Sequence, residues 1–172
     1  TPSGGSVSYP SNVMVVAAMN PCPCGYLGHP SKPCTCTETA VRRYRDKVSG
    51  PILDRIDLHV EVQNVDFEQL SDKRKEEPSS IIRKRVDKRF AGTNISCNAK
   101  MPPAMTKEIC ALSDDAAALL KISFDKLGLS ARAYDKILRF SRTIADLEGC
   151  ESISSVHVSE ALQYRALDRK YW

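Results

Sequence analysis

The sequence contains no Gly-x-x-x-x-Gly-Lys-[Ser/Thr] loop anywhere in its 172 residues. It also lacks a run of acidic residues at the end of an apolar strand, where such a run could hold magnesium. In P-loop enzymes a loop of that form cradles the phosphates. We therefore expect that this stretch of chain does not bind a nucleoside triphosphate in the P-loop manner on its own.

Long apolar runs are missing too. No run is long enough to span a bilayer, so we expect no membrane partner. The formal net charge is only +4 at pH 7, which permits contact with nucleic acid without requiring it. Cysteine, by contrast, is plentiful: there are seven, and four of them lie in one short loop. A secreted disulfide scaffold typically spreads an even number along the chain, so these cysteines favour a reduced, cytoplasmic setting.

The most prominent apolar stretch, Val13–Met19, ends abruptly at Asn20-Pro21. An unbroken valine-rich run of this length is typical of a strand buried on both faces of a parallel α/β sheet. Pro21 cannot continue a strand ladder, so Asn20 is predicted at the carboxyl end of the strand. Because ligands in open α/β sheets bind just beyond those ends, Asn20 is a candidate site residue.

Only one further good strand is predicted, at Asp57–Val62, and two strands do not make a parallel sheet. We therefore expect the chain to be the C-terminal piece of a larger protein. It divides into an α/β part at 1–64, a linker with a basic helix at 65–103, and an α-helical part at 104–172. Gly50-Pro51 is interpreted as a helix stop signal. Thr37 is predicted to cap a helix through Val48, and a second helix is predicted over Ser79–Phe90. Further helices are predicted over Asp114–Leu127, ended by Gly128, and over Ala131–Leu147, ended by Gly149. Ser154 or Ser155 is predicted to cap a last helix to about Leu167.

The sharpest chemical signal is a pair of Cys-x-Cys motifs, Cys22-x-Cys24 and Cys34-x-Cys36, separated by a loop of turn-forming residues. Four thiolates match the ligand set of a structural zinc site, and four protein ligands leave no open position for catalysis. A loop this polar buries little core, so the metal would supply its folding free energy. His29 could replace one thiolate, and the alternative is four reduced or redox-labile thiols.

Two arginines are candidate phosphate ligands. Arg55 lies just before the second predicted strand, where it either forms a surface salt bridge to Asp54 or Asp57 or reaches a phosphate. Arg132 falls in the first turn of a helix capped by Ser130, where the helix dipole disfavours a cation by about 0.3–1 kcal/mol. A helix N-terminus is itself an anion site, so a phosphate bound between that N-terminus and the Arg132 side chain would explain the placement of Arg132. The alternative is a solvated surface arginine.

A basic run, Arg42-Arg43-Tyr44-Arg45-Asp46-Lys47, comes after the cysteine loop. It is compatible with binding of nucleic acid. A solvated helix face is the preferred interpretation, because basic composition alone is weak evidence for a nucleic-acid interface.

Long and specific motifs cover nearly the whole chain. They are VAAMNPCPCGY at Val16–Tyr26, SGPILDRIDLHV at Ser49–Val60, LSARAY at Leu129–Tyr134, RTIADLEG at Arg142–Gly149 and EALQYR at Glu160–Arg165. These stretches resemble the magnesium-chelatase-like AAA+ ATPases of bacteria, of the competence protein ComM / YifB type. The resemblance implies the C-terminal part of an AAA+ core with an incomplete sheet and a Cys-rich insertion, followed by an α-helical lid.

The resemblance also implies roles for individual residues. Asn20 corresponds to the sensor-1 residue, which positions the attacking water and senses the γ-phosphate. Arg55 corresponds to the arginine finger, which reaches the nucleotide of the neighbouring subunit. Arg132 corresponds to the sensor-2 arginine of the lid, which points at the bound phosphates. The four cysteines fall in the insertion that comes after sensor 1.

By this resemblance, the full-length protein is expected to be a ring-forming homo-oligomer, of hexameric type, that uses ATP and Mg²⁺. Competence-linked members are associated with DNA branch migration and helicase action, which makes DNA the expected partner. The chain alone, without the Walker A and B segments, is expected to be inactive. One alternative is the ATPase motor of a metal chelatase. Another is a zinc-stabilised nucleic-acid-binding module without catalysis.

Overall fold

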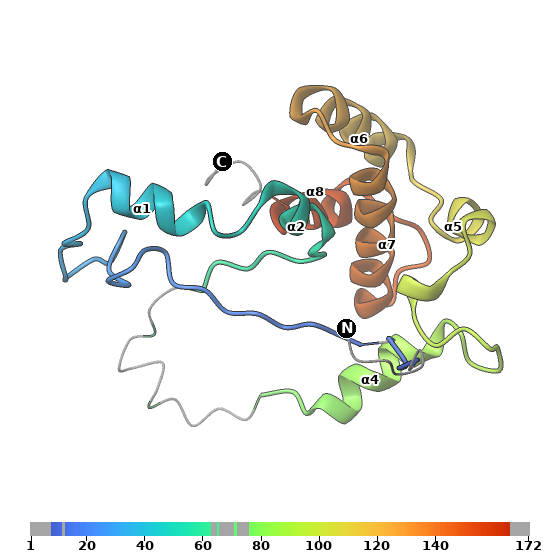
Figure 1. Ribbon diagram of the computed structural model, residues 1–172. Coiled ribbons are helices and arrows are strands. Elements are labelled where there is room, and N and C mark those ends of the chain that lie inside the picture. Colours follow the sequence, from blue (N-terminus) through green and yellow to red (C-terminus); the bar gives the residue numbers. More distant parts are fainter. Residues whose placement is uncertain (1–7, 12, 63–64, 66–70, 72–75, 166–172) are drawn as a thin grey trace, which may run out of the picture. The chain divides into compact units, whose positions relative to one another are not determined.

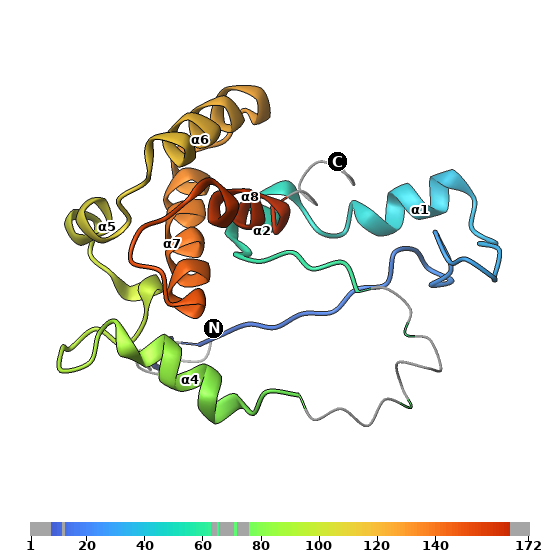
Figure 2. The same cartoon turned by 180° about the vertical axis from the view of Figure 1, so that it is seen from behind.

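The computed structural model describes residues 8–11, 13–62, 65, 71 and 76–165 (Figures 1 and 2). It divides into two compact units, Thr1–Lys47 and Val48–Trp172. The linker predicted at 65–103 lies partly outside the described residues, and so does the expected end of the last helix at Leu167. No helix within the described ranges has both the length and the apolar composition needed to cross a membrane.

The predicted buried strand Val13–Met19 is not confirmed. Its residues form no strand ladder, and the side chains of Val13 and Met14 are 74% and 90% exposed. Asp57–Val62 forms no ladder either, and the described part of the chain contains only an isolated parallel bridge, Leu112 to Ile153. The physical reason is that strand hydrogen bonds come from neighbouring strands, which the described residues do not supply.

The first unit continues through the cysteine loop into α1 (Glu38–Arg45). The predicted cap is confirmed, because the Thr37 hydroxyl accepts the N–H of Ala40 at 3.2 Å. The helix ends three residues before the predicted Val48, with Asp46 as its C-cap.

The second unit begins with α2 (Gly50–Arg55), so Gly50-Pro51, which comes after the end of α1, also begins the next helix. Pro51 lies in the first turn, where its missing N–H has no helical partner to lose and its fixed φ suits the helix. The chain then forms α4 (Ser79–Lys88), the 3₁₀ turn η1 (Asn98–Lys100) and α5 (Pro103–Ile109).

Three longer helices close the second unit, α6 (Asp114–Leu127), α7 (Ala131–Glu148) and α8 (Ser155–Gln163). The predicted ends are confirmed at Gly128 and Gly149, which both adopt the left-handed conformation that favours glycine. Side chains of these helices and of the segments before them form one apolar core: Phe90, Met101, Cys110, Ala116, Leu120, Ile137, Leu138, Ala145, Ile153, Val158 and Ala161.

A buried ion pair lies at the C-terminal end of α7. Arg142 is fully buried and donates to the Asp146 carboxylate at 3.0 Å and to the carbonyls of Cys150 and Glu151. Asp146 also accepts from Arg89 and from Asn98. Burial lowers the pKa of Arg142, and the Asp146 carboxylate opposes that shift. The pair therefore fixes the turn between α7 and α8 to α4 and η1.

We predict that Asp146→Ala destabilises the protein by about 3–5 kcal/mol, because it leaves the Arg142 guanidinium buried without its counter-charge. Asp135→Ala is the matched control. Asp135 also pairs with an arginine four residues along α7, but its side chain is 47% exposed against 7% for Asp146. An exposed pair contributes about 0–1 kcal/mol. Urea unfolding measures both changes, and equal losses would contradict the assigned role of burial.

Candidate functional site

The cysteine loop is shaped by tight turns rather than by a core. Gly25 and Gly28 both have φ of +81°, a conformation that side chains rarely adopt. The Gly25 N–H donates to the Cys22 carbonyl at 3.0 Å, and the His29 N–H to the Tyr26 carbonyl at 3.1 Å. These turns fold the loop so that Cys22 and Cys24 face Cys34 and Cys36.

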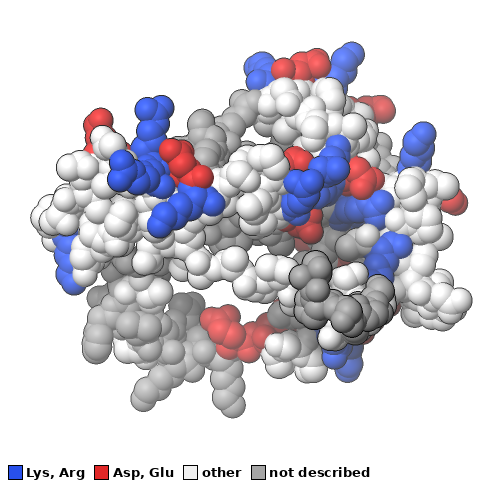
Figure 3. Space-filling model, viewed as in Figure 1, with Lys and Arg blue, Asp and Glu red and all other residues white. Residues whose placement is uncertain are grey.

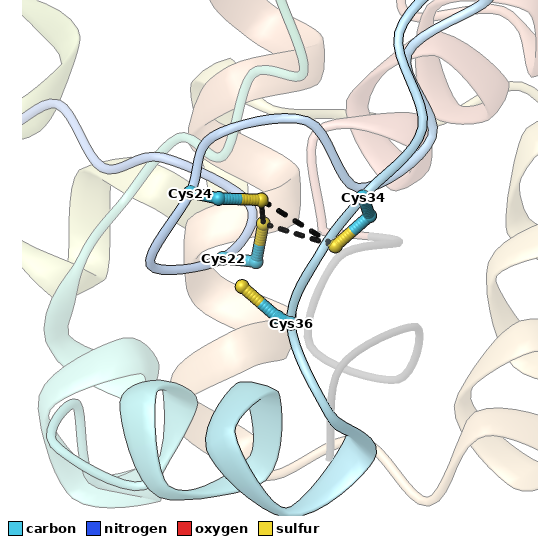
Figure 4. Close-up of side chains that lie close together, drawn as sticks. All are labelled: Cys22, Cys24, Cys34 and Cys36. Atoms are coloured by element: carbon cyan, nitrogen blue, oxygen red, sulfur yellow. Dashed lines mark hydrogen bonds between the residues drawn. The ribbon is translucent and has the colours of Figure 1, made fainter.

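The four sulfur atoms converge on one point (Figure 4). Cys22 Sγ lies 3.4 Å from Cys24 Sγ and 3.7 Å from Cys34 Sγ, and the Cys24–Cys34 separation is 3.5 Å. All four sulfurs lie within 4.8 Å of one another. A disulfide needs an S–S distance of about 2.05 Å, so these are free thiols held in a group.

This arrangement fits a tetrahedral metal ion. With Zn–S bonds of about 2.3 Å, tetrahedral geometry separates the sulfurs by about 3.8 Å. Three of the separations, 3.4–3.7 Å, are close to that value. Cys22, Cys24, Cys34 and Cys36 could therefore hold a zinc ion with little movement.

The loop also prepares one sulfur to be a thiolate. The backbone N–H groups of Tyr26 and Thr35 point at Cys24 and lower its pKa to about 5. At Cys36, the N–H of Cys24 acts in the same direction, but desolvation and the other three sulfurs raise its pKa to about 12. Four thiols this close do not all ionise without a cation among them, which is the electrostatic reason for a metal ion.

His29 does not take the place of a thiolate here. Its Nδ1 accepts the N–H groups of Ser31 and Lys32, both at 3.1 Å, and it lies outside the group of four sulfurs. Its ring packs edge-on against Tyr26.

Arg55 lies at the last residue of α2 and is exposed. Its Nη1 donates to the carbonyl of Pro51 at 2.7 Å, one turn back on its own helix. Within the described residues, neither Asp54 nor Asp57 pairs with the Arg55 guanidinium. The structure therefore does not contain the surface salt bridge that was the alternative interpretation of Arg55. The guanidinium therefore keeps donors available for an anion.

Arg132 also lies in the second unit, in the first turn of α7. The Ser130 hydroxyl accepts the N–H of Ala133 at 3.1 Å, as predicted for a cap. Arg132 Nη1 lies 3.2 Å from the Asp54 carboxylate, and its side chain is 60% exposed. The structure thus brings Arg132 to the residue next to Arg55, a proximity that their separation in sequence does not reveal.

Asn20 lies in the first unit, with the cysteines. Its side chain is exposed and lies over the turn at Gly25, where an added Cβ would be 3.9 Å from the Asn20 Cγ. The two arginines belong to the second unit, so Asn20 and the arginines are carried by different units of the chain.

A second group of possible metal ligands, Glu148, Cys150 and His157, was not predicted from the sequence. His157 Nδ1 accepts the N–H of Ser154 at 3.0 Å, so Nε2 carries the ring proton and bonds to Glu148 at 2.9 Å. Neither ring nitrogen keeps a lone pair for a metal. His157 forms the capping box of α8 with Ser154, and we assign no metal to the group.

The first unit is the more basic of the two. Residues 1–47 carry five Lys or Arg and two Asp or Glu, a net +3 of the chain's +4. Arg42, Arg43 and Lys47 are exposed, and blue side chains gather over α1 in Figure 3. Among the described residues, Arg42 and Arg43 have no carboxylate partner. The exposed face of α1 is therefore open to an anionic partner.

Comparison with known proteins identifies two family matches along the chain. Residues 2–70 match the model for the magnesium chelatase subunit ChlI, and residues 76–165 match the model for the C-terminal part of that subunit.

Individual relatives agree with these matches. An uncharacterized YifB protein of Salmonella typhimurium is 38% identical over 168 residues, or 95% of this chain. The competence protein ComM of Haemophilus influenzae is 37% identical over 176 residues, or 97% of this chain, and the YifB protein of Escherichia coli is 36% identical over 169 residues, or 95%. The chain spans 33% of the length of each of these relatives. It belongs to the magnesium chelatase ChlI family and, within that family, to the ComM and YifB type.

Proposed function

We propose that the chain is the sensor, arginine-finger and lid portion of an AAA+ ATPase that works as a homo-oligomer, of hexameric type, with ATP and Mg²⁺. The observation that carries the proposal is the state of Arg55. It is exposed, has no carboxylate partner in the described chain, and directly follows Asp54, the residue that pairs with Arg132. An arginine finger needs such donors for the charge that develops on the transferred phosphoryl group.

In this proposal the three residues have separate tasks. Asn20 orients the attacking water and contacts the γ-phosphate. Arg55 reaches the nucleotide of the neighbouring subunit, and Arg132 binds phosphate from the first turn of the lid helix α7. ATP supplies the reacting phosphoryl group and Mg²⁺ neutralises its charge, while this chain supplies only the groups that sense and stabilise it.

The exposed run Val13–Met19 supports a place in a larger core. Four of its residues, Val13, Met14, Val15 and Val16, are each more than 70% exposed. Contiguous apolar surface of this kind marks a face that another element covers. We infer that strands in the rest of the full-length protein pair with this run, which would place Asn20 at the edge of their sheet.

We propose zinc for the four cysteines, as a structural ion that holds the loop between Asn20 and α1. The short S–S separations support it, and the four-thiolate donor set suits zinc.

DNA is the proposed substrate. The name of the Haemophilus influenzae relative, a competence protein, supports this choice because competence is the uptake of DNA. The exposed arginines of α1 favour a second candidate function, a zinc-stabilised module that binds nucleic acid without catalysis. A metal-chelatase motor remains the rival enzyme, and nothing in the described residues favours it over a DNA motor.

Arg55→Ala in the full-length protein should lower the ATP turnover number by about 10³-fold or more while nucleotide binding stays nearly intact. Arg132→Ala should weaken nucleotide affinity or turnover, because it removes a direct phosphate ligand. Arg83→Ala is the control, since Arg83 is an exposed arginine of α4. Steady-state ATP hydrolysis and nucleotide titration measure both effects. Normal turnover by Arg55→Ala would refute the finger role.

Protein purified under reducing conditions should contain about one zinc ion per chain. Cys36→Ser should lower that stoichiometry, whereas Cys97→Ser, outside the sulfur group, should not. Elemental analysis with thiol titration gives the answer. Absence of zinc from protein whose cysteines are fully reduced would rule the site out.

If α1 contacts the DNA backbone, Arg42→Gln with Arg43→Gln should weaken binding by the full-length protein and reduce the salt-dependence slope by about two. Arg83→Gln with Lys84→Gln is the matched control, an exposed basic pair on α4. Fluorescence anisotropy at several salt concentrations, with and without ATP, measures the slope. Equal losses of DNA affinity for both double variants would show that α1 is not a specific contact to the DNA backbone. Strong binding without ATP would favour the non-catalytic module.

A further inference from the structure

The short helix α2 ends in three consecutive carbonyls whose hydrogen bonds come from elsewhere in the second unit. The N–H of Ile56 closes the last turn on the carbonyls of Ile52 and Leu53. The carbonyls of Asp54, Arg55 and Ile56 lie beyond that bond, and a helix end leaves such acceptors without intrahelical donors. The groups that donate hydrogen bonds to these three carbonyls therefore determine the position of the end of α2, and with it the position of Arg55.

Lys136 of α7 satisfies two of the three. Its Nζ donates to the Asp54 carbonyl at 2.8 Å and to the Arg55 carbonyl at 3.0 Å. It also lies 2.8 Å from the Asp57 carboxylate. A lysine ammonium has three donors, and all three are used here on one short segment. The Lys136 side chain is only 16% exposed, whereas its carboxylate partner Asp57 is 66% exposed.

The remaining carbonyl and the next few residues are held from the end of α8. Arg165 Nη1 donates to the Ile56 carbonyl at 3.0 Å, and the His59 N–H donates to the Tyr164 carbonyl at 3.0 Å. The positive charge of Lys136 and Arg165 also suits the negative end of the helix dipole. Cations of the helical part thus cover all three carbonyls.

The Arg132–Asp54 pair is a weaker connection by comparison. The side chains of Arg132 and Asp54 are 60% and 36% exposed, and surface pairs of this kind contribute little. Lys136, one turn further along α7, is shielded and makes three contacts. It is therefore the main link between α7 and the segment that carries Arg55.

We propose that Lys136 is a positioning residue for Arg55. It touches the backbone of Arg55 and fixes the end of α2 to the same helix that carries Arg132. The consequence is that the two arginines move as one body, so a displacement of α7 changes the aim of Arg55. The proposal rests on the finger role of Arg55 proposed above.

The test uses the full-length protein with Lys136→Met, which keeps the aliphatic length and removes the donors. We expect the ATP turnover number to fall about 10-fold or more while KM for ATP changes less than twofold. Lys136→Arg, which can donate to the same carbonyls, should recover most of the turnover. Lys107→Met, on the exposed side of α5, is the control and should behave as the unmodified protein.

A double variant separates positioning from general damage. If Lys136 acts through Arg55, adding Lys136→Met to Arg55→Ala should lower turnover less than twofold further. Multiplication of the two separate losses would overturn the proposal.

Hydrogen exchange tests the anchor independently of ATP hydrolysis. Lys136→Met should speed exchange at the amides of Ile56 and His59, which donate to the Ile52 and Tyr164 carbonyls, and leave those of Ala145 and Val158 protected. Unchanged exchange at Ile56, or lost protection throughout α7 and α8, would overturn the proposal. If Arg55→Ala proves fully active, the finger role fails, and faster exchange at Ile56 would still support the anchor.

Discussion

Carbonyl groups at the ends of short segments need donors, and in the second unit one helix supplies most of them. Lys136, Arg139 and Arg142 occur at three-residue intervals along α7, and each donates to the backbone of a different segment. Lys136 donates to carbonyls at the end of α2, and Arg139 donates to the Asn98 and Met101 carbonyls around η1. Arg142 donates to carbonyls of the turn after α7. Because buried carbonyls are costly to leave unpaired, these three contacts fix the surrounding segments to α7. Apolar packing then fills the space between the helices.

This use of cations explains which parts of the fold the sequence predicted. The ends of α6 and α7 were predicted because Ser130, Gly128 and Gly149 act through local backbone geometry, which neighbouring residues determine. The Lys136 and Arg139 contacts were not predicted, since a backbone carbonyl has no sequence signature and lies 38 or more residues away. Gly50-Pro51 was interpreted only as the stop of the preceding helix, which does end before it, but the same dipeptide also begins α2.

The candidate site shows the same division between local and distant information. The four cysteines lie close together because two short motifs and the turns between them suffice to bring the sulfurs together. The approach of Arg132 to Asp54 depends on how α7 packs, so residue types alone left the partner of Arg132 open. For Val13–Met19, local sequence was not sufficient. Its apolar pattern predicts burial, but the elements that would bury it are not among the described residues.

The bond that Arg55 makes here also fits the role proposed for it. Its guanidinium is held by the carbonyl of Pro51, a neutral acceptor, whereas Arg142 and Arg89 are held by the carboxylate of Asp146. A bond to a neutral group is weaker than a charge-assisted pair, so an incoming phosphate displaces the first far more readily than the second. The chain thus holds Arg89 and Arg142 with the carboxylate of Asp146 and leaves Arg55 on a carbonyl. Lys136 fixes the backbone from which Arg55 extends, so the side chain can exchange partners without the helix end moving.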